Sequence, residues 1–441
     1  GNWHHNRLPK SISGFCFDAR KIRPGECFIA LNKGARDGHD FVVQARQGGA
    51  SSVLVERPLS VDIPQLLVSD TLLAMEAIAR AVRLQFGGCV LGVTGSCGKT
   101  STREMLLHLL SPEATHATEG NWNNRIGVPM TLFGLHQSRK ANAVIEAGID
   151  QPGEMSHLGR MIVPDLTVVT QIGPAHMEKL RSLDGIAAEK ALLFEHARDG
   201  SELIIHADLF RFKAFKPFLP RATVLVPADE TLDKAIHGMA KSVLRYQIDG
   251  RKIKIFGLFR ETVFTLASQS LGMRKNAVLA LTAASRIGVP AESLKERLEG
   301  WSPAPNRGRL FEQNKSLYYL DCYNSNPLSL ADALDAFVES VPEEMARYYV
   351  LGAMNELGPE AVRLHSESVQ ALHVRPQDKV FLVGPEVLRK AYRDGMDAAP
   401  EQVYEGESVE KIKSVVAPFQ GAFFLKGSRA YALERLLNPT I

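Results

Sequence analysis

Residues 89–100 read Cys89-Val90-Leu91-Gly92-Val93-Thr94-Gly95-Ser96-Cys97-Gly98-Lys99-Thr100, an apolar run followed by a glycine loop that ends in Lys-Thr. The apolar run predicts a β-strand over 89–94, and the residues after the loop predict a helix over 100–110. In such a loop, glycines let backbone N–H groups close around phosphate oxygens, and the helix N-terminus adds partial positive charge. Lys99 can reach β- and γ-phosphates, and the Thr100 hydroxyl can ligate Mg²⁺. We therefore assign nucleotide binding to Thr94, Gly95, Ser96, Cys97, Gly98, Lys99, Thr100 and Ser101.

The loop is a shortened form of the usual phosphate-binding pattern. Val93 occupies the position of the first glycine in G-x-x-x-x-G-K-T, which leaves T-G-x-x-G-K-T. The alternative is a chance glycine turn before a helix. A GTPase would also need an N-K-x-D base reader, and neither Asn-Lys pair, at 32–33 and 314–315, is followed by x-Asp. The sequence thus argues against a GTP-driven switch.

Outward from this loop, apolar runs alternate with helical-length segments along the whole chain. At about 150 residues per domain, 441 residues predict three domains. A predicted helix over 71–86 ends at Gly87-Gly88, and Pro303 and Pro305 mark a second joint. We predict a small α/β substrate domain (1–86), a central P-loop ATPase-like domain with a mostly parallel sheet (87–303) and a Rossmann-like α/β domain (304–441). Strands are expected at 26–31, 52–55, 89–94, 143–145, 166–170, 203–205, 317–320, 348–351, 379–383 and 422–425, and further helices at 328–337 and 360–372.

The composition excludes several classes of protein. The chain has 52 Lys+Arg against 49 Asp+Glu, a formal net charge of +3, so neither general nucleic-acid nor anionic-membrane binding is expected. The 5 cysteines are scattered without a C-x-x-C pair, which argues against a disulfide framework and a zinc ribbon. The sequence has no apolar run long enough to span a membrane, and its first ten residues lack the apolar core of a signal peptide. We expect a cytoplasmic, monomeric protein without stable membrane insertion.

Two features downstream of the loop carry candidate ligands. Segment 118–129 contains Asn121, Asn123 and Asn124, a density of short amides that suits holding substrate and metal-bound water, although it also fits a polar turn. Glu146 ends an apolar strand, where an α/β sheet presents ligands, and it is a candidate Mg²⁺ ligand beside Thr100. Alone, such a residue is more often a surface carboxylate.

Further segments follow in a fixed order, and together they carry a family resemblance. They are 18–20 (D-A-R), 37–41 (D-G-H-D-F), 171–176 (Q-I-G-P-A-H), 186–190 (I-A-A-E-K), 321–327 (D-C-Y-N-S-N-P), 352–358 (G-A-M-N-E-L-G) and 426–429 (K-G-S-R). This series resembles the Mur ligase superfamily over nearly the whole chain. The resemblance implies ATP-driven joining of a UDP-N-acetylmuramoyl tripeptide to D-alanyl-D-alanine in peptidoglycan precursor synthesis. The carboxylate is first phosphorylated to an acyl phosphate, because a free carboxylate is a poor acyl donor.

The resemblance also implies roles for individual residues, each with a plainer alternative. Lys99, Glu146, His176 and Lys190 would be catalytic, with His176 at a second Mg²⁺ and Lys190 ligating metal as a carbamate. A structural histidine and a cationic phosphate clamp are the alternatives for the last two. Asn276 would contact the adenine, although its helix also has an ordinary core face. Arg309 and Asp321 would contact phosphate and ribose; the plainer alternatives are a surface ion pair for Arg309 and a strand-end cap for Asp321. Predicted substrate residues are Asp18, Arg20 and His39 near the UDP end, the three asparagines above, and Tyr323, Asn324 and Asn326.

The chain departs from the family pattern at Ala19, Gln171, Leu192, Met273, Leu320 and Ala353. These departures leave open a paralogous ligase that joins another carboxylate and amine. A nucleotide-binding regulatory protein is a third possibility, but a switch needs no second metal site, so Glu146, His176 and Lys190 favour an enzyme. The diamino acid at the third peptide position stays undetermined.

Overall fold

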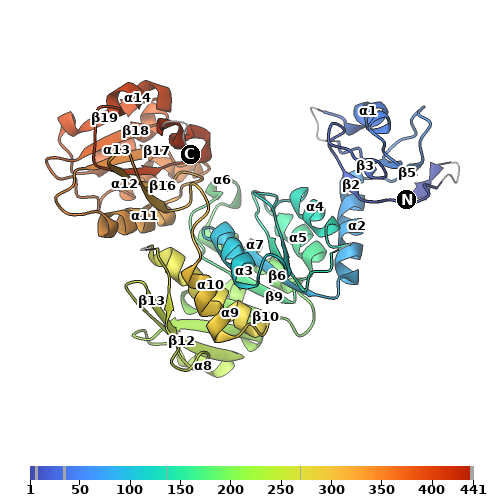
Figure 1. Cartoon of the computed structure of the whole chain (residues 1–441), viewed down its shortest axis with the longest axis horizontal. Coiled ribbons are helices and arrows are strands. Elements are labelled where there is room, and N and C mark those ends of the chain that lie inside the picture. Colours follow the sequence, from blue (N-terminus) through green and yellow to red (C-terminus); the bar gives the residue numbers. More distant parts are fainter. Residues whose placement is uncertain (5–7, 33–35, 137, 269, 438–441) are drawn as a thin grey trace.

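The computed structural model describes residues 1–4, 8–32, 36–136, 138–268 and 270–437, and it forms three lobes, each built around its own sheet (Figure 1). The first sheet runs in the order β1 (Asn2–Trp3), β5 (Gln65–Leu67), β4 (Ser52–Val55), β3 (Cys27–Ile29), β2 (Phe15–Cys16). The second runs β14 (Phe264–Thr265), β13 (Lys252–Ile255), β12 (Ser242–Asp249), β11 (Ala222–Pro227), β10 (Glu202–His206), β9 (Leu166–Val169), β6 (Cys89–Thr94), β8 (Asn142–Glu146), β7 (Thr115–Ala117). The third runs β15 (Arg309–Gln313), β16 (Ser316–Asp321), β20 (Ala422–Lys426), β17 (Arg347–Gly352), β18 (Lys379–Val383), β19 (Val403–Gly406). The predicted α/β class is confirmed.

Strand β6 lies in the interior of the second sheet, parallel to β8 and β9. Its Val90 packs with the helices α5 (Glu154–Ile162) and α7 (Leu183–Glu195) on one face of the sheet. Its Leu91 and Val93 pack with α3 (Lys99–Leu109) and α9 (Leu271–Arg286) on the other. Because both faces are covered, the strand is apolar throughout, as the sequence showed. The carboxyl ends of these parallel strands meet at one edge, where polar loops follow.

The second sheet ends in an antiparallel extension that the sequence analysis did not predict. Strands β12, β13 and β14 pair antiparallel at the far edge. In β13, Ile253 and Ile255 are buried while Lys252 and Lys254 are exposed. Such alternation is typical of a strand that has one buried and one solvent-exposed face. The sequence of β13 therefore lacks the continuous apolar run by which the central strands were predicted.

Helix α2 (Thr71–Gln85) joins the first lobe to the second and packs on the second (Figure 1). Its Met75 and Ala79 share a core with Val128 and Leu132 of α4 (Gly127–Phe133). The buried Arg83 donates hydrogen bonds of 2.8 Å to the carbonyls of residues 162 and 163, and it forms an ion pair with Asp165. The first lobe is therefore attached through a helix that is anchored on its neighbour.

The third lobe is a mainly parallel sheet with helices on both faces. Helix α11 (Pro327–Ser340) begins with a capping box between Asn326 and Ser329 and with proline at its first turn, which fixes its start. Helix α12 (Ala361–Glu367) is shorter than the predicted 360–372. Beyond Glu367 the backbone bonds change to the tighter i−3 type, from the N–H of Val369 to the Ser366 carbonyl and from the N–H of Gln370 to the Glu367 carbonyl, each at 3.4 Å, so the α-helix gives way to turns.

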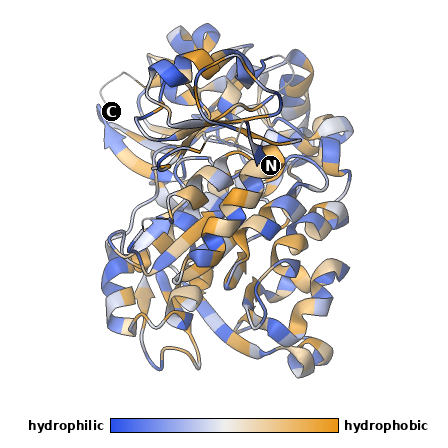
Figure 2. Cartoon of the chain, turned by 90° about the vertical axis from the view of Figure 1, so that its right-hand side faces the viewer, coloured by the Kyte–Doolittle hydropathy of each residue, from blue (hydrophilic) through white to orange (hydrophobic). Residues whose placement is uncertain are grey.

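Hydropathy follows this layering. Figure 2 shows helices banded in polar and apolar colours, as expected of helices that cover a sheet with one side and meet water with the other. Within the described parts of the chain, no helix is long and apolar enough to cross a membrane.

Candidate active site

A cleft of about 380 Å³ lies between the second and third lobes. Many residues singled out in the sequence line it, from segments far apart in the chain. They are Ser96, Cys97, Gly98, Lys99, Thr100, Ser101, Asn121, Asn123, Asn124, Glu146, His176, Asn276, Asp321, Tyr323, Asn324 and Asn326. The fold thus brings the glycine loop, the amide-rich loop and the segment that follows β16 of the third lobe to one place.

The glycine loop has the backbone conformation that its sequence requires. Gly98 has φ of +81° and precedes α3, and a Cβ there would lie 2.6 Å from the side-chain amide of Asn276. Only glycine allows this close approach at a left-handed position. Lys99 Nζ donates to the carbonyl of Gly95 at 2.9 Å, so the ammonium lies over the loop. Burial lowers the pKa of Lys99 from its usual value. The N-terminus of α3 and this lysine give the loop the charge that phosphate binding needs.

Glu146 lies at the carboxyl end of β8 and is 1% exposed. Its Oε1 accepts hydrogen bonds from the Thr100 hydroxyl at 3.1 Å and from Asn123 Nδ2 at 2.7 Å. Its Oε2 lies 3.3 Å from Arg103 Nε, but neither atom has a hydrogen-bond partner in the described structure. A buried carboxylate oxygen without a hydrogen bond is unusual. With the Thr100 hydroxyl nearby, the Glu146 carboxylate is suited to bind a hard cation, which prefers oxygen ligands.

The three asparagines of the amide-rich loop have different surroundings. Asn123 holds Glu146, as described. Asn124 Oδ1 accepts from the backbone N–H groups of Ile126 at 3.1 Å and Gly127 at 2.9 Å, so it caps the start of α4. Asn121 is exposed on the cleft wall. One residue therefore orients a carboxylate, one fixes a helix, and one faces the cleft.

His176 contacts two carboxylates that the sequence analysis gave no role, and one of them belongs to the third lobe. Its Nδ1 lies 3.3 Å from Asp150 Oδ1 and 2.6 Å from Glu356 Oε2 of the third lobe. The ligand atoms of the three residues lie within 4.8 Å of one another, so the group could hold a cation. The His176 contact also lowers the pKa of Glu356. Glu356 belongs to the quoted segment 352–358, whereas Asp150 follows Glu146 in an exposed loop without a motif of its own.

Lys190 is buried in α7 at 1% exposure. Burial lowers the pKa of its amine well below the usual range, and the nearby ammonium of Lys99 lowers it further. The side chain is therefore not the solvated lysine that is common on helices. Lys190 is not among the described residues that line the cleft, but it lies near enough to Lys99, Cys97 and Asp150 of the lining for their charges to act on its amine.

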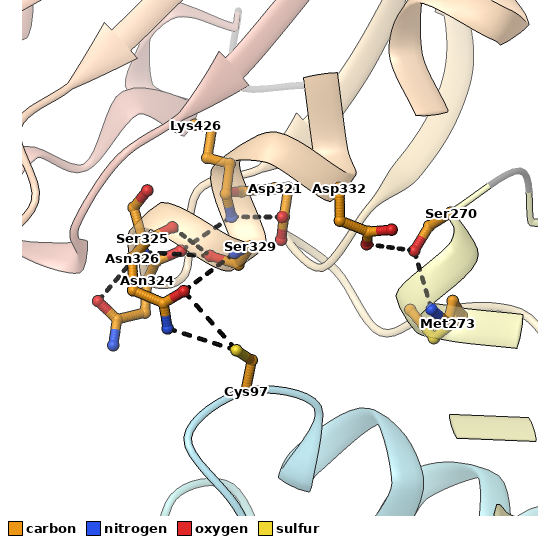
Figure 3. Close-up of polar contacts among 10 residues, drawn as sticks. All are labelled: Cys97, Ser270, Met273, Asp321, Asn324, Ser325, Asn326, Ser329, Asp332 and Lys426. Atoms are coloured by element: carbon orange, nitrogen blue, oxygen red, sulfur yellow. Dashed lines mark hydrogen bonds and ion pairs between the residues drawn. The ribbon is translucent and has the colours of Figure 1, made fainter. Parts of the chain in front are cut away.

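In the third lobe, the cleft is edged by an ion pair and a stacked arginine. Lys426 is 1% exposed and donates to Asp321 Oδ2 at 2.5 Å and to the carbonyl of Asn324 at 3.2 Å (Figure 3). The guanidinium of Arg307 lies 3.9 Å from the ring centroid of Tyr323 and faces the cleft. The sequence analysis quoted Lys426 in the K-G-S-R segment, but that segment did not predict its ion pair with Asp321.

The structure places Arg309, which we expect to contact phosphate, outside the cleft lining. This residue begins edge strand β15, is exposed, and places its guanidinium 5.6 Å from the ring centroid of Phe311. It is absent from the cleft lining of the described residues, and Arg307, in the turn before the strand, takes that place. Gly308, between the two arginines, has φ of +74°, so the chain turns there: Arg307 stays in the turn, and Arg309 enters the edge strand β15.

The first-lobe residues predicted near the UDP end lie outside this cleft. Arg20 binds its own neighbour Asp18 through two hydrogen bonds, of 2.9 and 2.8 Å. His39 is buried, with Nδ1 2.5 Å from Asp37 Oδ1 and Nε2 accepting the N–H of Glu56 at 2.8 Å. Both ring nitrogens of His39 are thus occupied, so it organises a loop rather than offering a nitrogen to a ligand.

The departures from the family pattern fall into two groups. Gln171 and Met273 line the cleft. Ala19, Leu320 and Ala353 are buried within their own lobes, and the partly buried Leu192 packs against the core of the second lobe. Most of the departures therefore concern packing rather than the surface that a substrate would touch.

Comparison with known proteins agrees with this geometry. Residues 93–284 match the Mur ligase middle domain, and residues 306–422 match the Mur ligase glutamate ligase domain. A UDP-N-acetylmuramoyl-tripeptide–D-alanyl-D-alanine ligase of Escherichia coli strain K12 is 31% identical over 96% of this chain and 92% of its own. The enzyme of that name from Bacillus subtilis strain 168 is 32% identical over 85% and 80%. The crystal structure of MurF from Acinetobacter baumannii superposes with a TM-score of 0.83 and 26% identity, covering 99% of this chain and 95% of that one.

Proposed function

Because this chain belongs to the Mur ligase family, we propose that it joins a UDP-N-acetylmuramoyl tripeptide to D-alanyl-D-alanine in an ATP-dependent reaction of peptidoglycan precursor synthesis. It is an acid–amino-acid ligase. The observation that carries this function is the single cleft that gathers the glycine loop, Glu146 and the third-lobe segment 321–326. In this function, the adenine would lie against Asn276 and the ribose near Asp321, both of which line the cleft.

The first chemical step is phosphoryl transfer to the peptide. A carboxylate oxygen of the tripeptide attacks the γ-phosphorus, the bond to the ADP oxygen breaks, and an acyl phosphate and ADP result. Lys99 and the N-terminus of α3 neutralise charge on the phosphate oxygens. Arg307 adds positive charge from the opposite wall of the cleft.

The second step forms the amide. The amine nitrogen of D-alanyl-D-alanine attacks the acyl carbon, the bond to the phosphate oxygen breaks, and the nitrogen loses a proton. The protein contributes chiefly by alignment, because both nucleophiles must reach the reacting atoms in order. Asn121, Tyr323, Asn324 and Asn326 lie along the cleft where these substrates would be held.

The residues present fit Mg²⁺. Thr100 and Glu146 would hold one ion, since the Thr100 hydroxyl and Glu146 Oε1 lie 3.1 Å apart and, among the described residues, Glu146 Oε2 makes no hydrogen bond beside its ion pair with Arg103. His176 would serve a second, where Asp150 and Glu356 add carboxylate oxygens. Bound there, Mg²⁺ would neutralise phosphate charge.

Lys190 is the residue for which we propose carbamylation. Reaction with CO₂ needs the neutral amine, and burial favours that form by lowering the pKa. The product carries a negative charge on oxygen, which suits Mg²⁺ better than an ammonium that cannot ligate a cation. The alternative is a cationic clamp on phosphate.

The three-domain division at 1–86, 87–303 and 304–441 is supported by the sheets, each of which draws its strands from one of these ranges. In this division the first lobe, with Asp18, Arg20 and the Asp37–His39 loop, would hold the UDP end. Nucleotide-linked substrates and ATP fit a cytoplasmic enzyme.

One experiment separates the ligase from its alternatives. ADP and phosphate should appear only when UDP-N-acetylmuramoyl tripeptide and D-alanyl-D-alanine are both supplied, together with a new amide by mass spectrometry. Equal phosphate release without the dipeptide, and no amide, would rule out this function. A panel of other carboxylates and amines tests the paralogous ligase.

A further inference from the structure

Asp332 of the third lobe caps a helix of the second lobe. It lies on α11, and its Oδ1 accepts the backbone N–H of Gly272 at 2.7 Å, at the start of α9. Its Oδ2 accepts the hydroxyl of Ser270 at 2.6 Å, and that hydroxyl oxygen accepts the N–H of Met273 at 2.9 Å (Figure 3). The carboxylate thus reaches across the cleft to the first turn of α9.

Helix α9 leads from this cap to the nucleotide loop. Asn276 lies one turn after Gly272, and its side-chain amide packs against Gly98 of the loop. A displacement of the start of α9 would therefore move the side chain that closes against the loop.

Helix α11 also contacts the nucleotide loop directly, at its N-terminus. The side chain of Asn326, the N-cap of α11, lies 3.6 Å from Cys97 Sγ through its oxygen and 3.5 Å through its nitrogen. A single helix of the third lobe thus meets both the loop and α9. Asp321, at the end of the strand that leads to α11, is fixed to the same lobe by Lys426.

We propose that Asp332 is a positioning residue for ATP, which sets the distance between the adenine side of the cleft on α9 and the ribose side on the third lobe. This rests on the proposed use of the cleft for ATP. A carboxylate at a helix N-terminus is favoured by the helix dipole, and hydrogen bonds to a charged acceptor are stronger than neutral ones. Burial raises the pKa of Asp332, and the Gly272 N–H and Ser270 hydroxyl partly oppose that shift. Asp332 acts through α9, so its loss affects ATP binding more than the chemical steps.

The test uses the full chain and measures ATP binding directly as well as turnover. The variants are Asp332→Ala, Asp332→Asn, Ser270→Ala and the double variant Ser270→Ala/Asp332→Ala. Asp335→Ala is the matched control, because Asp335 is an exposed carboxylate one turn further along the same helix. For Asp332→Ala we expect the Kd and KM for ATP to rise roughly tenfold, from the loss of bonds to a charged acceptor. We expect kcat and the KM values for the tripeptide and dipeptide to stay within about threefold of wild type.

The double variant separates positioning from direct contact. If Asp332 acts through Ser270 and the start of α9, the effects on ATP affinity are less than additive, and Asp332→Asn, which keeps one acceptor oxygen, falls between wild type and alanine. Three outcomes would each overturn the proposal. The effects of the two single variants could add fully in the double variant, Asp332→Ala could bind ATP as tightly as Asp335→Ala, or Asp332→Ala could lose affinity equally for all substrates with a lowered Tm. Because ATP binding is measured without turnover, failure of the ligase function would show separately, as normal ATP binding by wild type without amide formation.

Discussion

Asn123 Nδ2 lies 2.7 Å from Glu146 Oε1 and donates to it a hydrogen bond that crosses from the amide-rich loop to the end of β8. The same oxygen accepts the Thr100 hydroxyl of the nucleotide loop. Three segments of chain are therefore joined at one carboxylate, and the orientation of that carboxylate depends on a residue that need not touch substrate.

Asn123→Ala should lower kcat by roughly tenfold or more and raise the Mg²⁺ concentration needed for half-maximal activity, since a hydrogen bond to a charged group is lost. Asn123→Asp keeps the size of the side chain but places a second carboxylate against Glu146. Repulsion should raise the pKa of one of the two carboxyl groups and move the acidic limb of the pH–rate profile to higher pH. Activity titrated against Mg²⁺ and pH checks both. An unchanged Mg²⁺ requirement in both variants would contradict the proposed role of Glu146.

Lys99→Ala should abolish turnover while the fold stays intact. The loss of a charge-assisted phosphate contact should cost on the order of 2–4 kcal/mol of transition-state stabilisation. The readouts are kcat from phosphate release and the circular dichroism spectrum. Lys234→Ala, an exposed lysine at the start of α8 (Lys234–Met239), is the control. Near-full kcat in the Lys99 variant would mean that the loop is not the ATP site.

Lys190→Ala should nearly eliminate activity, and added short carboxylic acids such as acetate should restore part of it by supplying the missing oxygens. Lys190→Arg should not restore activity, although it keeps the positive charge, because a guanidinium cannot be converted into an oxygen ligand. Activity across an acetate titration is the measurement. An active arginine variant would instead indicate a cationic clamp on phosphate.

Lys190→Met should flatten the pH dependence of stability in buffer free of CO₂. Burial lowers the pKa of Lys190 well below its ordinary value of 10.5. Between those two pKa values the unfolded chain binds the proton and the folded chain does not, so the free energy of unfolding of wild type rises with pH. The methionine variant should be the more stable at neutral pH, and its advantage should shrink as the pH approaches 10.5. Urea unfolding at several pH values tests this, and a constant difference would contradict the lowered pKa.

ATP should protect Cys97 from alkylation. The thiol lies in the loop, half-buried beside Asn326, and burial raises its pKa, so labelling requires alkaline buffer. Bound nucleotide should slow its labelling roughly tenfold, in proportion to the occupied fraction of sites. Mass spectrometry follows Cys97 against Cys16, a half-buried thiol of the first lobe that ATP should not affect. Cys97→Ser identifies the labelled peptide, and equal labelling with and without ATP would count against nucleotide in the loop.

The local unit around residues 89–100 could be predicted from sequence because its signals are local. An apolar strand, two glycines with required backbone freedom and a helix start are all specified within a dozen neighbouring residues. Glu146 followed from the same logic, since the ends of parallel strands meet at one edge of a sheet. The antiparallel edge strands were missed because half-buried alternation is a weaker signal than a continuous apolar run.

The sequence by itself determined the α/β class, the nucleotide loop, the strand-end carboxylate and, through its ordered segments, the family. Tertiary structure alone decided that Arg307 rather than Arg309 faces the cleft, that His176 meets Glu356, that Lys190 is buried, and that Asp332 caps α9. Each of these depends on how separate lobes or layers pack against one another. No local pattern encodes such contacts, because their partners lie far apart in the chain and the burial of a side chain depends on what covers it.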